Sequence, residues 1–352
     1  MNISQFLSLF ETQMQDQEYE GASRTLKQLQ VLGMEEPQLQ LLTARIYECT
    51  NRTAEAEQLY RQVLKSSASN SIINQARQGL QVIQDQERQK REARIALEMT
   101  EEESKDHSLL LLLPIAVSDR EQKAEGLARI FNLDIYTARS VLPTKHLKIY
   151  RLGRYGEMKV YAEELKKYGI ESLPIRLKTI ESISVYPVIY LEEDKEGINI
   201  TTKDKDFYVP WQLLPRMVKG QVPIIEEVVI GVDKKYQIAK AEQTKDFLSI
   251  VDLHCPQQQM IFRLQDQQYQ FIQGKRFIGD NITMMARWKE LIAWLEQTGN
   301  FAIVDDFLPF AEMALLYPET LQEITPKVNF ARVKECLWDN SFHLYSCIFF
   351  GR

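Results

Sequence analysis

The sequence predicts an α+β protein of several domains: tetratricopeptide-like helical hairpins, then a small α/β sandwich, then a β-rich domain with C-terminal helices. Residues 1 to about 100 are rich in Gln, Glu, Ala, Leu and Arg, with few β-branched residues, which favours helices. Apolar runs then alternate with amphipathic segments, and short strand patterns separated by polar turns begin near Thr179. A chain of 352 residues can hold two or three cores, and we place the domains at 1–106, 107–179, 180–299 and 300–352.

An internal repeat marks the N-terminal part. Small and aromatic residues alternate at positions typical of a tetratricopeptide repeat: Ala44, Tyr47, Ala56, Tyr60 and Val63. The equivalents about 34 residues earlier, the period of this repeat, are Ala22, Leu26 and Leu29. A third repeat is reduced to one helix around Ile72 to Ile83. The array is either a surface that binds a protein partner or a module for helical packing and dimerisation.

A charged stretch, 84–106, continues a helix through its first half and becomes an acidic linker that ends near His107. The pattern that follows predicts β-α-α-β-α-β, the order of a small open sandwich. Its strands are 109–117, 147–151 and 170–178, and its helices begin at Asp119, Leu133 and Tyr155. We expect a tight turn at Gly153 and a helix-ending glycine at Gly169.

Short strands dominate from Ile183 to Ile272, broken by a short helix predicted over 210–220. The expected strands are 183–190, 198–202, 207–209, 224–232, 247–254, 260–264 and 269–272. A helix with Asn281 as its N-cap follows and would cap a curled sheet or partial barrel, which resembles pleckstrin-homology or GRAM domains in outline. The apolar tail 300–352 must dock on another domain or on a partner subunit, which leaves a homo-oligomer open.

Composition excludes several classes of function. The net charge of −6 argues against a general nucleic-acid coat or a binder of anionic membranes. The N-terminus lacks the features of a signal peptide, and the longest apolar run, 109–117, is interrupted by Pro114, so we expect a cytoplasmic protein outside the membrane.

The cysteines and histidines predict no special chemistry. The four cysteines are scattered without a CxxC pair, so we expect free thiols and no metal site. His254 and Cys255 would point to opposite faces of a strand and could not easily serve one ion. No GxSxG, P-loop, HExxH or GxGxxG motif is present, so we expect neither an enzyme nor a cofactor.

Arginines beside glycine or aromatic residues form the candidate ligand site. Arg151 and Arg154 flank Gly153 ahead of a helix start, and Tyr155 follows. Further candidates are Trp211 and Arg216 on the predicted short helix, and Arg276 after Gly274. Guanidinium groups bind phosphate in a bidentate manner, stack on rings and read the O6/N7 edge of guanine. A compact guanine nucleotide would use all of these, but solvated surface arginines explain the same pattern.

The overall layout resembles cyanobacterial tetratricopeptide-type proteins, among them the CdgR-type receptors for cyclic di-GMP. The resemblance lies in the order of a short helical-repeat region followed by α/β and β parts, and no signature motif carries it. RLGR at 151–154 is one residue shorter than the RxxxR motif of PilZ domains, so it does not support a PilZ domain. The resemblance implies a non-enzymatic receptor that binds cyclic di-GMP and relays the signal to a partner protein. The alternative is an assembly scaffold without a small ligand.

Overall fold

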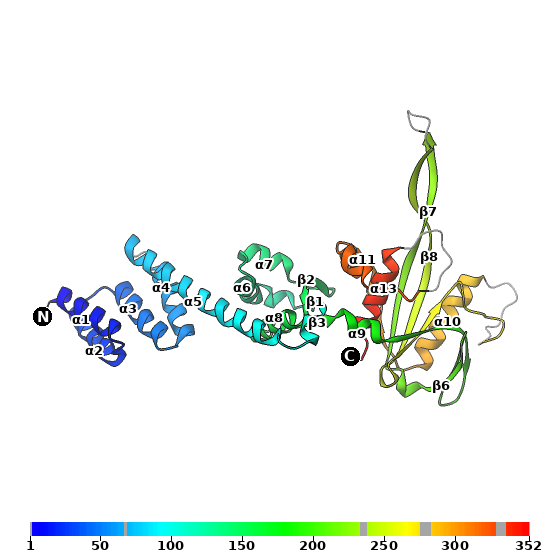
Figure 1. The fold of residues 1–352 in the computed structure, drawn as a ribbon, viewed down its shortest axis with the longest axis horizontal. Helices are drawn as coiled ribbons and strands as arrows, with labels where there is room; N and C mark the ends of the chain where they lie inside the picture. Colours follow the sequence, from blue (N-terminus) through cyan, green and yellow to red (C-terminus); the bar gives the residue numbers. More distant parts are fainter. Residues whose placement is uncertain (1, 67–68, 233–237, 275–282, 329–335, 352) are drawn as a thin grey trace. The chain divides into compact units, whose positions relative to one another are not determined.

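The computed structural model describes residues 2–66, 69–232, 238–274, 283–328 and 336–351. It contains both helices and sheets, and the chain divides into two compact units, Met1–Leu97 and Glu98–Arg352. The first unit is helical, and the second holds every strand of the described residues (Figure 1). The predicted border at 106 and the predicted borders within the second unit stay predictions.

The helical unit is built from α1 (Ile3–Gln15), α2 (Tyr19–Val31), α3 (Glu36–Cys49), α4 (Thr53–Lys65) and α5 (Asn70–Glu98). Fully buried Ala22, Ala44 and Ala56 let neighbouring helices approach closely. A Cβ added at Gly79 of α5 would lie 2.3 Å from the Tyr60 ring, so this glycine makes room for the aromatic residue of α4. Tyr60 donates a 2.6 Å hydrogen bond to Glu48, which ties α4 to α3. Paired helices with small contact residues are therefore present, while the tetratricopeptide assignment stays a prediction.

The second unit begins with a three-stranded antiparallel sheet in the order β2-β1-β3. Its elements are η1 (Glu103–Lys105), β1 (His107–Leu112), η2 (Val117–Asp119), α6 (Arg120–Phe131), α7 (Ile135–Val141), β2 (Lys148–Arg154), α8 (Tyr155–Lys167) and β3 (Ser172–Arg176). The predicted order of strands and helices is confirmed. Gly169 follows α8 with φ of 68°, as expected of a glycine beyond a helix end.

A seven-stranded sheet follows in the order β10-β7-β8-β9-β4-β5-β6. Its strands are β4 (Ser184–Glu193), β5 (Gly197–Thr202), β6 (Asp206–Pro210), β7 (Arg216–Val232), β8 (Ile238–Cys255), β9 (Met260–Gln265) and β10 (Ala302–Val304). The accompanying helices are α9 (Leu177–Ser182), η3 (Trp211–Leu213), η4 (Pro256–Gln258), α10 (Met284–Thr298), α11 (Phe307–Ala314), α12 (Pro318–Gln322) and α13 (Leu337–Ile348). The outer parts of β7 and β8 extend beyond the other strands as a two-stranded ribbon (Figure 1).

Three apolar cores arrange the second unit in layers. Helices α6, α7 and α8 cover one face of the small sheet. Its other face shares a core with α9, α11, α12, α13 and one face of the large sheet, so the apolar tail fills the space between the two sheets. Helix α10 packs on the opposite face of the large sheet through Trp288, Leu291 and Leu295. No detail of the layers confirms a pleckstrin-homology or GRAM domain.

Several local predictions were wrong. Residues 148–154 form one continuous strand, so Gly153 does not lie in a turn. The predicted helix over 210–220 is the short 3-10 turn η3 followed by strand β7, which begins at Arg216. Residues 269–272 form no strand, and the N-cap of α10 is Thr283, whose side chain accepts a hydrogen bond from Ala286. Asn281 lies outside the described residues.

Candidate functional site

The structure separates the two arginines on which the predicted ligand site was centred. Arg151 lies opposite Leu110, which belongs to the core under α6, α7 and α8. Arg154 lies opposite His107, three positions further along the same strand. Successive strand residues alternate between faces, so an odd spacing directs the Cα–Cβ bonds of Arg151 and Arg154 to opposite faces of β2. The expectation that they converge around a turn is wrong because the turn is a strand.

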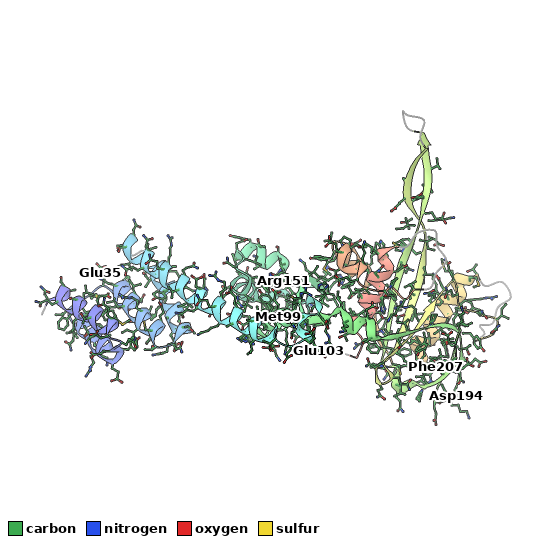
Figure 2. The ribbon with its side chains drawn as sticks, in the orientation of Figure 1. Glu35, Met99, Glu103, Arg151, Asp194 and Phe207 are labelled. Carbon is green, nitrogen blue, oxygen red and sulfur yellow. The ribbon has the colours of Figure 1, made fainter. Side chains whose placement is uncertain are left out.

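Arg151, which is labelled in Figure 2, contacts aromatic side chains of α6 and α8. Its guanidinium carbon lies 5.1 Å from the ring centroid of Tyr161 and 5.7 Å from that of Phe131. Its Nη2 lies 3.4 Å from Glu157 Oε1. The charge of Arg151 is thus already shared between two aromatic faces and one carboxylate.

Arg154 lines a cavity of about 300 Å³, and Arg151 is not among the residues that line it. Its Nη1 donates a 2.7 Å hydrogen bond to the Lys105 carbonyl. The cavity wall also includes His107, Glu157 and Glu323, and His107 Nδ1 lies 2.6 Å from Glu323 Oε2. Two carboxylates accompany the arginine, so the cavity does not concentrate positive charge.

Tyr155 does not line the cavity that Arg154 borders. The guanidinium carbon of Arg176 lies 5.6 Å from its ring centroid, and Arg176 Nη1 lies 2.7 Å from Glu103 Oε2. Tyr155 is therefore the aromatic member of a cluster that ties η1 to β3 and α8.

Trp211 is the first residue of η3, and Arg216 is the first residue of strand β7 in the large sheet. Trp211 packs edge-on against Trp294 and Phe301, with ring centroids 6.1 and 6.2 Å away. Arg216 donates a hydrogen bond from Nη1 to the Phe349 carbonyl, and it borders a second cavity of about 290 Å³. Arg276 lies outside the described residues. The candidate residues that the structure describes therefore do not form one site. Arg154 lines the first cavity and Arg216 lines the second.

A buried polar network connects the large sheet to α13, and the sequence patterns did not predict it. Arg263 of β9 and Asp252 of β8 are fully buried and form two hydrogen bonds of 2.7 and 2.8 Å. Arg263 Nη1 also donates to the carbonyls of Pro326 and Lys327, each at 3.0 Å. The signal was present in the sequence, because Asp252 interrupts the mostly apolar stretch 247–253 and Arg263 interrupts the apolar stretch 260–264.

Ser346 of α13 completes the network. Its hydroxyl donates a 2.6 Å hydrogen bond to Asp252 Oδ2 and lies 2.9 Å from His254 Nε2. Since a serine has one proton, His254 must donate from Nε2. His254 Nδ1 is then a buried acceptor with no partner among the described residues. A second proton there would be poorly accommodated, so the network requires neutral histidine.

Electrostatics agree with this assignment. Burial, helped by Arg216 and Arg263, lowers the pKa of His254 to about 4 against the pull of Asp252. Burial and the nearby charges of Arg263 and Lys327 hold the pKa of His343 well below its usual range. Cys347 lies 3.6 Å from His343 Nδ1, and burial raises the pKa of its thiol to about 12. All three groups are buried, and their shifted pKa values keep the two histidines neutral and the thiol protonated near neutral pH.

His254 and Cys255 confirm the predicted split of neighbouring strand residues. Cys255 belongs to the core under α10, while His254 faces Ser346 and Phe350 on the other side. Within the described residues, no three His, Cys, Asp or Glu side chains are grouped to hold a metal ion. Nor does any described helix combine the length and apolar character needed to span a membrane.

Comparisons with protein-family models, curated proteins and solved structures found no match to this chain. The resemblance to cyclic di-GMP receptors of the CdgR type therefore stays a prediction.

Proposed function

We propose that this protein is a non-catalytic interaction scaffold that binds other proteins through the ribbon of β7 and β8 and through the helical unit. The ribbon carries the proposal. Strands β7 and β8 pair over almost their whole length, but β10 covers only Arg216–Val218 of β7 and β9 covers only Ile250–Cys255 of β8. The outer half of each strand therefore has no second neighbour among the described residues.

Such a ribbon is well suited to protein binding. A two-stranded ribbon without a covering layer is marginally stable in water, and open edges are templates for another strand. Its described side chains include exposed apolar groups: Val229 is 65% exposed and Phe247 is 49% exposed. A partner that packs on the ribbon would bury these groups and supply the missing layer.

The helical unit supports the same function. Val31, the last residue of α2, is 82% exposed, and Leu32 and Val82 are also exposed. Helical repeats of the tetratricopeptide type commonly present such surfaces to peptides, so we propose that a partner protein binds here.

Site-specific photo-cross-linking tests the scaffold function. A photoreactive amino acid replaces Val229 in the full-length chain, and the matched control replaces Tyr136, which is 80% exposed on α7. We expect a discrete cross-linked species, identified by mass spectrometry, from position 229 in cells of the source organism. The double variant Val229→Lys, Phe247→Lys should lose assembly without a change in unfolding. Equal cross-linking from both positions would contradict the proposal.

A cyclic di-GMP receptor is the second candidate, favoured by the cavity that Arg154 borders. A volume of about 300 Å³ lies at the lower end of the range for ligand pockets, so the dinucleotide would extend beyond it. Calorimetric titration with cyclic di-GMP should show micromolar binding that Arg154→Ala abolishes and Arg151→Ala preserves, because Arg151 does not line the cavity. If cyclic di-GMP does not bind, the receptor function is excluded and the scaffold function is the one that stands.

A further inference from the structure

The second cavity differs in charge from the first. It lies where the segment before β7, the turn η4 and the end of α13 meet, and its volume is about 290 Å³. Among the described residues, its wall includes Arg216 and no acidic side chain: the others are Gln212, Leu213, Pro215, Pro256, Gln257, Phe349 and Gly351. The cavity bordered by Arg154, in contrast, includes Glu157 and Glu323.

Arg216 has unused hydrogen-bonding capacity. Its Nη1 donates to the Phe349 carbonyl and so caps the C-terminal end of α13. Its Nε is buried and has no hydrogen-bond partner in the described part of the chain. Burial lowers the pKa of Arg216, and no carboxylate of the described residues raises it in return. A half-buried guanidinium without a counter-ion is unusual in a folded protein.

The unused edge has a defined chemistry. Nε and the remaining terminal nitrogen of a guanidinium point two N–H groups in parallel, and this fork matches the two oxygens of a carboxylate or phosphate. The capping bond takes Nη1, so the Nε edge is the part of Arg216 still to be filled. Because the helix end already has its cation, an anion at this edge would meet a guanidinium rather than bare carbonyl groups.

The remaining walls specify the rest of the ligand. Leu213, Pro215, Pro256 and the Phe349 ring are apolar, and the amides of Gln212 and Gln257 add donors. The volume suits a molecule smaller than most drug-sized ligands. We infer that this cavity binds the carboxylate or phosphate group of a small, partly apolar molecule through Arg216. The inference is independent of the scaffold function.

Calorimetric titration of the full-length chain with benzoate, phenyl phosphate and inorganic phosphate tests the inference. We expect saturable one-site binding of benzoate or phenyl phosphate. Arg216→Met should weaken it by at least about tenfold, the effect of losing a hydrogen bond to a charged group. Arg216→Lys, which keeps the charge but loses the fork, should fall between. The matched control Arg154→Met should bind like the wild type.

A second variant separates the ligand from the helix cap. Gln212→Leu with Gln257→Leu leaves Arg216 and the Phe349 carbonyl untouched, so we expect unchanged thermal unfolding and several-fold weaker binding. Absence of saturable binding at millimolar probe, or undiminished affinity in Arg216→Met, would overturn the site. Equal affinity for inorganic phosphate and phenyl phosphate would overturn the role given to the apolar walls.

Discussion

The two faces of the large sheet use the same strands for opposite purposes. Along β8 and β9, alternate residues face α10 and form an apolar core: Val251, Leu253, Cys255, Phe262 and Leu264. The residues between them face α13 and include Asp252, His254 and Arg263, all buried. One helix is held by apolar packing, and the other by apolar packing plus a charged, hydrogen-bonded network.

The two faces contribute to the stability of the fold in different ways. Removal of apolar surface from water stabilises the α10 face in rough proportion to area, with little dependence on pH. On the α13 face, desolvation offsets much of the attraction between Asp252 and Arg263, so the pair adds little net stability. Loss of one partner is nevertheless costly, because it leaves a buried charge without compensation. The polar face is therefore the more fragile of the two.

The largest expected effect comes from breaking the ion pair. Asp252→Ala leaves Arg263 buried without a carboxylate and should lower the free energy of unfolding by about 3 to 5 kcal/mol. All four tryptophans lie within residues 98–352, so tryptophan fluorescence during urea unfolding reports on this unit. The double variant Asp252→Leu, Arg263→Met should be less destabilised than Asp252→Ala. A larger loss in the double variant would contradict the desolvation argument.

Truncation on the apolar face should cost slightly less. Leu295 of α10 is fully buried, and Leu295→Ala should lower the free energy of unfolding by about 3 kcal/mol through lost burial and a cavity. The same fluorescence measurement applies at pH 7 and pH 5. We expect the cost of this substitution to be equal at both, which distinguishes this face from the other.

Acid should weaken the α13 face. Folding lowers the pKa of His254 to about 4 from 6.5, so the unfolded chain takes up the proton first as pH falls. The contribution of neutral His254 is complete above pH 6.5 and is lost progressively toward pH 4. Between pH 7 and pH 5 this amounts to about 2 kcal/mol, and His343 acts in the same direction. Urea unfolding of His254→Gln should show a smaller fall in stability than the wild type over this range; an equal fall would show that His254 does not titrate on unfolding.

The smallest effect should follow loss of the bridging hydroxyl. Ser346→Ala removes the donor to Asp252 and the acceptor for His254, while Arg263 still satisfies the carboxylate. We expect a loss of about 1 to 2 kcal/mol in the free energy of unfolding. Ser341→Ala is a suitable control, since the buried Ser341 Oγ has no hydrogen-bond partner among the described residues. A control loss as large as that of Ser346→Ala would assign the effect to packing.

The local features of this protein could be predicted from its residues alone. Amphipathic spacing and small residues predicted the N-terminal helices, and the β-α-α-β-α-β order of the small sheet followed from apolar periodicity and from Gly169. These features depend on residues close together in the chain, where backbone preference and side-chain spacing act directly. The apolar composition of 300–352 likewise required burial, and α11 and α13 meet that requirement between the two sheets.

The meeting places of the polar groups depend on contacts between distant parts of the chain and could not be predicted from local patterns. Gly153 favoured a turn locally, but pairing of Ser108 with Gly153 extends β2 through it and sends Arg151 and Arg154 to opposite faces. Asp252 and Ser346 lie 94 residues apart, and no local pattern encodes their hydrogen bond. Register and helix docking are set by the sum of many distant contacts. Contacts between distant parts of the chain likewise place Arg216 at the end of α13 rather than beside Arg151.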